Sequence, residues 1–117
     1  MADVPEHEQP LEERCAEAGR QYEAAAAQAR YYRENRKNRF SRMVNEVFAL
    51  EGEMPMNKAQ SLVHASEAWQ DFTDKLLETA NKAAELKMAY ENLKIELDRQ
   101  RRQEIQSAVE RKYSRYS

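Results

Sequence analysis

Apolar residues recur along two long stretches of the chain at alternating steps of three and four positions. Such spacing places them on one stripe of a helix, as in the seam of a coiled coil. The first stretch consists of Leu11, Cys15, Ala18, Tyr22, Ala25, Ala29 and Tyr32. The second consists of Trp69, Phe72, Leu76, Thr79, Ala83, Leu86, Tyr90, Leu93 and Leu97. The pattern predicts two long amphipathic helices that pack against each other.

A short turn-like segment separates the two stretches. It reads Glu51-Gly52-Glu53-Met54-Pro55-Met56-Asn57, and no other Gly or Pro follows Gly19. Asn57 with Gln60 has the spacing of a capping box, and Ser66 is a second candidate N-cap. We therefore expect an all-α fold, a long antiparallel helical hairpin with a short connecting helix. The expected parts are a disordered leader at 1–10, one domain at 11–113 with helices at about 11–50, 58–65 and 67–113, and a tail at 114–117.

Both seams slip by one step of four, which locally unwinds a supercoil. After Tyr32 the seam is expected to continue through Arg36, Phe40, Met43, Val47 and Leu50. After Leu97 it is expected to continue through Arg101, Ile105, Val109, Tyr113 and Tyr116. Folding the hairpin at the turn predicts that Phe40 lies near Leu76 and Tyr22 near Leu97.

Composition indicates a modest core. Of 117 residues, 34% are charged and 41% are apolar, and alanine makes up much of the apolar class. A two-helix hairpin has a single seam to bury, so we expect homo-oligomerisation, with a dimer as the simplest form, or a protein partner. No apolar run approaches the ~20 residues of a membrane span, and the acidic start lacks a secretory signal. The single Cys15 fits a reducing, cytoplasmic compartment.

Charge alternates in four blocks along the chain. Residues 1–29 and 43–98 are acidic, whereas 30–42 and 99–117 are basic. In the expected hairpin the basic block 30–42 lies beside Asp74, Glu78 and Glu85, and the basic tail lies beside the acidic first helix. Complementary blocks favour the antiparallel register.

The basic block interleaves cations with aromatic residues, a mixture that holds phosphates and stacks on bases. Its candidate nucleic-acid-binding residues are Arg33, Arg36, Lys37, Arg39 and Arg42. The alternative is a solvated helix face whose cations pair with the acidic residues opposite. A further alternative is that the acidic faces of 43–98 imitate a nucleic-acid backbone.

Candidate protein-binding residues lie at both ends of the hairpin. They are Trp69, Met54 and Met56 near the turn, and Arg111, Tyr113 and Tyr116 in the tail. For Trp69 the alternative is packing at the closed end of the hairpin, for the methionines it is covering the tip, and for the tail it is a frayed helix end.

No motif indicates catalysis. The chain has no Gly-rich phosphate loop and no nucleophile elbow, and neither His7 nor His64 has a ligand partner at helical spacing. We expect no enzyme activity, no cofactor and no metal.

Three segments carry a resemblance. They are Met54-Pro55-Met56-Asn57-Lys58-Ala59, Ser66-Glu67-Ala68-Trp69 and Ala83-Ala84-Glu85-Leu86-Lys87-Met88-Ala89-Tyr90-Glu91-Asn92-Leu93-Lys94. Residues ~54–105 resemble small helical phage and prophage proteins encoded beside single-strand-annealing recombinases and single-stranded-DNA-binding proteins. The resemblance implies a phage-type accessory or host-takeover protein that binds host recombination or defence machinery, and so serves DNA recombination or host defence evasion. If a phage encodes the protein, its compartment is the cytoplasm of the host cell. We therefore expect a non-catalytic protein-binding module that engages or inhibits a host or phage recombination or defence protein. The alternative is a nucleic-acid-binding recombination accessory protein.

Overall fold

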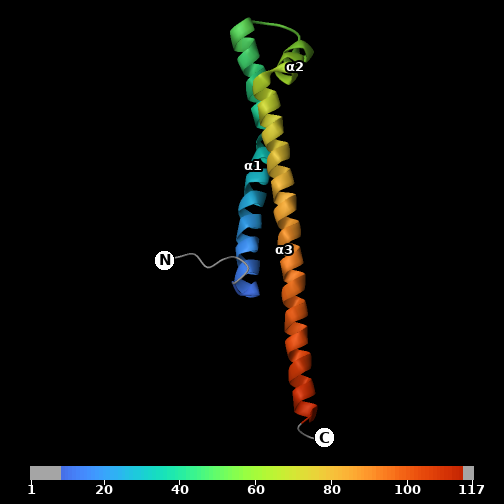
Figure 1. The fold of residues 1–117 in the computed structure, drawn as a ribbon. Coiled ribbons are helices and arrows are strands. Elements are labelled where there is room, and N and C mark those ends of the chain that lie inside the picture. The colour runs from blue at the N-terminus through green and yellow to red at the C-terminus, as the bar shows by residue number, and fades with distance from the viewer. Residues whose placement is uncertain (1–8, 115–117) are drawn as a thin grey trace, which may run out of the picture. The chain divides into compact units, whose positions relative to one another are not determined.

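The computed structural model describes residues 9–114, which form three α-helices and no strand (Figure 1). Helix α1 spans Leu11–Glu51, α2 spans Met56–Ala65 and α3 spans Glu67–Ser114. The predicted all-α helical hairpin with a short connecting helix is confirmed. Residues 1–8 of the predicted leader and 115–117 of the predicted tail, Tyr116 included, lie outside the described residues. No helix within 9–114 is both long and apolar enough to cross a membrane.

The chain divides into two compact units. The described residues of unit 1 are 9–23 and 84–114, and unit 2 comprises 24–83. In unit 1 the start of α1 pairs with the second half of α3, and Tyr22 meets Tyr90 with ring centroids 6.2 Å apart. In unit 2 the remainder of α1 packs on α2 and the start of α3, and Tyr32 meets Phe72 at 5.5 Å. Within each unit α1 and α3 run antiparallel.

The two apolar stretches that predicted the seam are the buried stripes of α1 and α3. Every residue from Leu11 to Tyr32 in the first stretch, and from Trp69 to Leu97 in the second, is buried or half-buried. The predicted continuations are only partly right. Phe40, Met43 and Val47 are half-buried, but Arg36 and Leu50 are exposed. From residue 98 to residue 114 every position is exposed, because α1 begins at residue 11 and Glu12 already pairs with Arg101.

The predicted register is wrong by one heptad in each unit. Phe40 packs against Trp69, seven residues before the predicted Leu76, and Tyr22 packs against Tyr90, seven residues before the predicted Leu97. A shift of seven residues keeps the same seam positions facing inward, so the apolar pattern alone does not distinguish the two registers.

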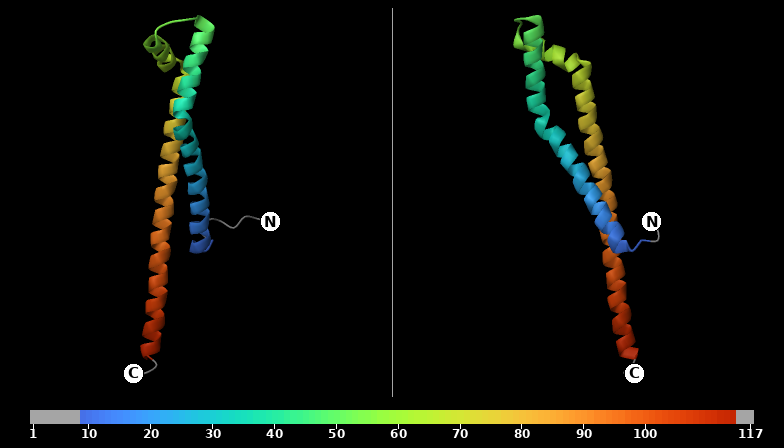
Figure 2. Two further views of the ribbon diagram at one scale, coloured as in Figure 1. Left: turned by 180° about the vertical axis from the view of Figure 1, so that it is seen from behind. Right: turned by 90° about the vertical axis from the view of Figure 1, so that its left-hand side faces the viewer.

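The core of unit 2 forms where the connection returns the chain along α1. Its buried residues are Val44, Ala59, Val63, Trp69 and Phe72. Helix α2 contributes Ala59 and Val63 to this core and lies beside the C-terminal part of α1 (Figure 2). The short helix therefore supplies apolar surface that the two long helices alone do not have.

Backbone capping defines the turns. Gly52 follows the last residue of α1 with φ +86°, and its N–H donates to the Phe48 carbonyl at 3.0 Å, as in a left-handed C-cap. The predicted N-cap at Ser66 is confirmed, because the Ser66 hydroxyl accepts a hydrogen bond from the Trp69 N–H at 3.2 Å. The Asn57 cap is wrong. Helix α2 starts at Met56, and the Pro55 carbonyl accepts the Ala59 N–H at 3.2 Å, so Asn57 is already inside the first turn.

Candidate functional site

A hollow of about 370 Å³ opens on unit 2 between α1, α2 and the start of α3. Its lining consists of Arg36, Lys37, Phe40, Ser41, His64 and Trp69. Two lining side chains are cations, three carry aromatic rings, one is a hydroxyl, and none is a carboxylate. Aromatic and cationic side chains around a concave surface favour a ligand that is planar and anionic.

Ring packing sets the floor of this hollow. The Phe40 ring lies 4.8 Å from the His64 ring and 5.0 Å from the Trp69 ring, centroid to centroid. Phe72 stacks on the far side of Trp69 at 5.5 Å with an interplanar angle of 21°. Trp69 is only 5% exposed, Phe40 is half-buried and His64 is exposed. Trp69 is therefore packed between Phe40 and Phe72, and Phe40 and His64 offer most of the accessible ring surface of the floor.

The basic block 30–42 has no acidic partner in the described part of the chain. Arg30, Arg33, Arg36, Lys37, Arg39 and Arg42 are all exposed. The ion pairs among residues 9–114 instead join Arg20 to Glu17, Arg101 to Glu12 and Arg102 to Asp98. Arg39 has a different contact, because its guanidinium carbon lies 5.7 Å from the centre of the Phe72 ring. Within the described residues, this block forms no ion pair with Asp74 or Glu78, although Arg39 lies against the same part of α3.

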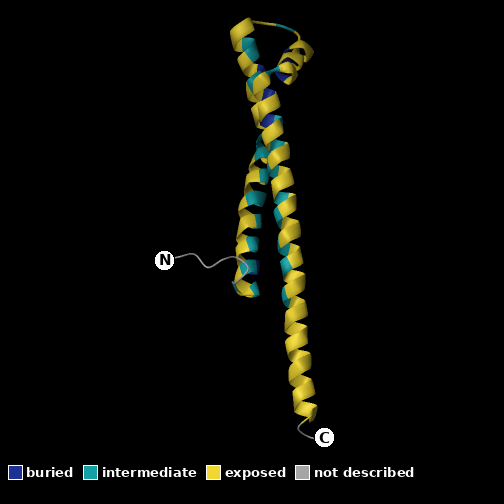
Figure 3. Cartoon of the chain, viewed as in Figure 1, coloured by how far each residue is buried: buried dark blue, intermediate teal, exposed yellow. Residues whose placement is uncertain are grey.

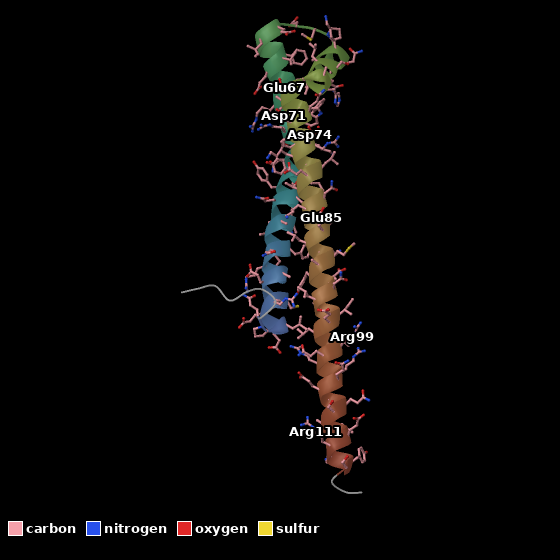
Figure 4. All side chains as sticks on the ribbon, in the orientation of Figure 1. Glu67, Asp71, Asp74, Glu85, Arg99 and Arg111 are labelled. Atoms are coloured by element: carbon pink, nitrogen blue, oxygen red, sulfur yellow. The ribbon has the colours of Figure 1, made fainter. Side chains whose placement is uncertain are left out.

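Three acids at the start of α3 lie on a face of that helix away from the hollow. Glu67, Asp71 and Asp74 follow one another down the helix at steps of four and three (Figure 4). At 3.6 residues per turn, these positions lie on the side of α3 away from Trp69. Glu34 is the one acid within the basic block 30–42, whose six cations outnumber it, so the block next to the hollow keeps a net positive charge.

A second exposed feature is the C-terminal part of α3, residues 99–114, which we call the α3 extension (Figure 3). Ile105, Val109 and Tyr113 follow at steps of four and are 65%, 45% and 73% exposed. Figure 4 labels Arg99 and Arg111 on the same segment. The extension is amphipathic, yet α1 does not cover it.

The predicted site residues fall into three groups. Arg36, Lys37 and Trp69 come together at the hollow, whereas Arg33, Arg39 and Arg42 stay outside its lining. Near the turn, Met54 packs against the core and Met56 is 55% exposed. On the α3 extension, Arg111 and Tyr113 are exposed.

Sequence reasoning missed three residues of the hollow, Phe40, Ser41 and His64. The first two lie inside the basic and aromatic run, and the interleaving of residue types was a usable signal for them. His64 had no such signal, because only the packing of α2 against α1 brings its ring to Phe40.

Unit 1 has a hollow of about 290 Å³ with a mixed lining. Arg14 and Glu17 both line it, and Arg14 Nε is buried without a hydrogen-bond partner in the described part of the chain. Because this lining holds a base and an acid together, it favours neither anions nor cations. The hollow on unit 2 is the stronger candidate.

Metal-binding geometry is absent from the described residues. Among residues 9–114, no three His, Cys, Asp or Glu side chains lie close enough together to hold a metal ion. Cys15, the single cysteine, is a free thiol buried in the seam of unit 1.

Comparisons of the chain with protein-family models, with curated proteins and with solved structures found no match.

Proposed function

We propose that the protein is a non-catalytic binding module that docks a partner protein on the α3 extension. The single observation that supports this is the exposed apolar row Ile105, Val109 and Tyr113 on a helix that α1 leaves uncovered. Burying an aliphatic side chain contributes about 1.5–3 kcal/mol when it goes from fully exposed to fully covered. The three side chains in one row therefore supply the apolar part of a contact, to which the charges around the row must add.

Charge defines the chemistry of the partner. Arg101 and Arg102 precede Ile105 by four and three residues, and Lys112 follows Val109 by three, so all three cations flank the apolar row. Over the extension, five cations (Arg99, Arg101, Arg102, Arg111 and Lys112) outnumber the acids Glu104 and Glu110. The complementary surface is an apolar groove or helix edged by carboxylates.

A second copy of the chain fits the extension less well. An antiparallel pair that places Ile105 opposite Val109 also places Glu104 opposite Glu110 and Arg102 opposite Lys112. Like charges in facing positions disfavour such a pair. The predicted homo-oligomer has another exposed apolar pair available, Met88 and Ile95, which are seven residues apart on α3. Light scattering on the purified protein measures whether that pair associates.

The finer identity of the partner comes from the sequence resemblance. It makes the partner a host or phage recombination or defence protein that the module engages or inhibits, in the cytoplasm where Cys15 stays reduced. The chain supplies no catalytic group in this scheme. Its contribution is the rigid presentation of the extension by a helix that is anchored through unit 1.

Site-specific crosslinking in cells tests the proposal. A photoactivatable amino acid is placed at Val109 and, as a control, at Ser107, which lies on the opposite side of the helix. We expect one protein adduct from Val109 and none from Ser107. The crosslinked protein is then purified, and its binding is measured by calorimetry with wild-type protein and with Val109→Asp.

The variant should weaken binding at least tenfold, because it places an unpaired charge in an apolar contact. Ser107→Asp should bind like the wild type. Equal adducts from both positions, or equal affinity of Val109→Asp and wild type, would refute docking on the extension. A crosslinked partner outside nucleic-acid processing and defence would refute the partner class.

A further inference from the structure

We propose that the hollow on unit 2 binds a nucleobase of single-stranded nucleic acid, with the adjoining phosphates held by a basic stripe of α1. This basic stripe consists of Arg30, Arg33, Arg36 and Lys37. This site is separate from the α3 extension, so it does not depend on the proposed protein partner. The two sites lie on different units, and each has its own variants.

The base-binding part is the aromatic floor. Phe40 and His64 offer ring surface, and Trp69 closes the floor from below, where Phe72 supports it. Stacking on aromatic side chains is tolerant of base identity, because every base has a π-face. The volume of about 370 Å³ lies at the lower end of the range of ligand pockets, which suits one base better than a larger ligand.

The phosphate-binding part is the rim and its continuation along α1. Arg36 and Lys37 line the hollow, with the Ser41 hydroxyl one turn beyond Lys37. Arg30 and Arg33 precede Lys37 by seven and four residues, so the three cations lie on one face at intervals of about one helical turn, ~5 Å. Glu34 lies on the same face, but no ion pair joins an acid to any of these cations within 9–114.

A strand explains this arrangement better than a free nucleotide does. A nucleotide would use the rim cations Arg36 and Lys37 alone. The row that continues to Arg33 and Arg30 matches a chain of phosphates leading away from the hollow. An acidic peptide would also meet the cations, but it would leave the aromatic floor without a planar group to stack on.

Trp69 is the only tryptophan in the chain and lines the hollow, so it reports occupancy directly. The experiment titrates full-length protein with an oligothymidylate of twelve nucleotides, following tryptophan fluorescence and the anisotropy of a labelled strand. We expect quenching of Trp69 on binding. If each of the four cations holds one phosphate, affinity should fall about 50-fold between 50 and 200 mM salt, from a slope of about −0.7 per phosphate contact.

Two variants separate the parts of the site. Arg36→Ala with Lys37→Ala should lower the salt slope by about 1.4, because two phosphate contacts are lost. His64→Ala should weaken binding about tenfold and leave the salt slope unchanged, since it removes ring surface but no phosphate contact. Lys75→Ala is the matched control, an exposed cation on unit 2 outside the hollow, and should bind like the wild type. Circular dichroism verifies that each variant is folded.

Any one of three results would overturn the proposed site. Thymidine monophosphate that binds as tightly as the oligonucleotide would assign the hollow to a free nucleotide. Polyglutamate that competes equally well without quenching Trp69 would reduce the stripe to a general anion-binding surface. Failure to bind the oligonucleotide at 50 mM salt would exclude the site altogether, with no consequence for docking on the α3 extension.

Discussion

Ser66 is the residue whose removal best tests how the hairpin is held at its turn. Its backbone is extended, with φ −73° and ψ 144°, between the end of α2 and the start of α3. The hydroxyl accepts the Trp69 N–H at 3.2 Å and donates to the Val63 carbonyl at 2.6 Å. One hydroxyl therefore links the last turn of α2 to the first turn of α3.

The expected loss in the free energy of unfolding follows from the backbone groups that Ser66→Ala leaves without a hydrogen bond. The Trp69 N–H loses its acceptor beside a buried ring, which corresponds to the loss of an N-cap, about 0.5–2 kcal/mol. The Val63 carbonyl is not orphaned, because the Ser66 N–H still donates to it at 3.0 Å. We expect the free energy of unfolding to fall by about 1–2 kcal/mol, in the upper part of the capping range.

Ser61→Ala is a matched control within α2. The Ser61 hydroxyl also donates to a backbone carbonyl, that of Asn57 at 2.9 Å, but it is exposed and inside a helix. Alanine has the higher helix propensity, so this variant should be neutral or more stable by up to ~0.5 kcal/mol.

Urea denaturation measures both variants, with Trp69 fluorescence reporting unit 2 and circular dichroism reporting total helix. Ser66→Asp retains a capping acceptor without the hydroxyl donor and should fall between wild type and Ser66→Ala. If Ser66→Ala and Ser61→Ala have the same free energy of unfolding, the cap does not stabilise the turn and the reasoning is refuted.

Three further predictions concern unit 1. Gly19→Leu should destabilise the protein by about 1–3 kcal/mol in urea, because even a Cβ at Gly19 would lie 3.2 Å from ring carbons of Tyr90; an unchanged midpoint would contradict this close approach. Hydrogen bonding from Arg20 holds the pKa of Glu17 below its ordinary value, so Arg20→Gln should raise that pKa in an NMR titration. Because the pKa of Glu17 is lower in the folded protein, its charged carboxylate stabilises the fold at pH values above the ordinary carboxyl pKa, and this stability is lost as the pH falls through the lowered pKa. Arg20→Gln should therefore lose less stability on acidification than the wild type does, and equal losses would contradict the linkage. Cys15 is 7% exposed, so a thiol reagent should modify it far more slowly in buffer than in concentrated urea, and equal rates would contradict its burial.

The seam was predictable because burial along a helix is a local, periodic property. Each residue in the two apolar stretches faces the same stripe whatever the partner helix does beyond it, and the structure buries or half-buries all of them. Ser66 was predictable for a similar reason, because an N-cap depends on a few consecutive residues. Asn57 failed as a cap because Pro55 had already started the helix.

The candidate site was predictable only in part. The basic and aromatic run identified Arg36 and Lys37 as one group, and the pattern of the second stretch identified Trp69. Their meeting at one hollow depends on α2, which brings His64 to Phe40. Residue types in the sequence carry no information about such a meeting between three helices.

The sequence by itself determined the helices, their inward faces and the alternating charge. The tertiary structure decided the register, because heptad patterns pair equally well when shifted by seven residues. Contacts that do not repeat set the choice, such as Gly19 against Tyr90 in unit 1 and the core around Val63 in unit 2. That choice has two consequences for function. It places Trp69 beside Phe40 at the hollow, and by pairing Glu12 with Arg101 it leaves the rest of α3 uncovered.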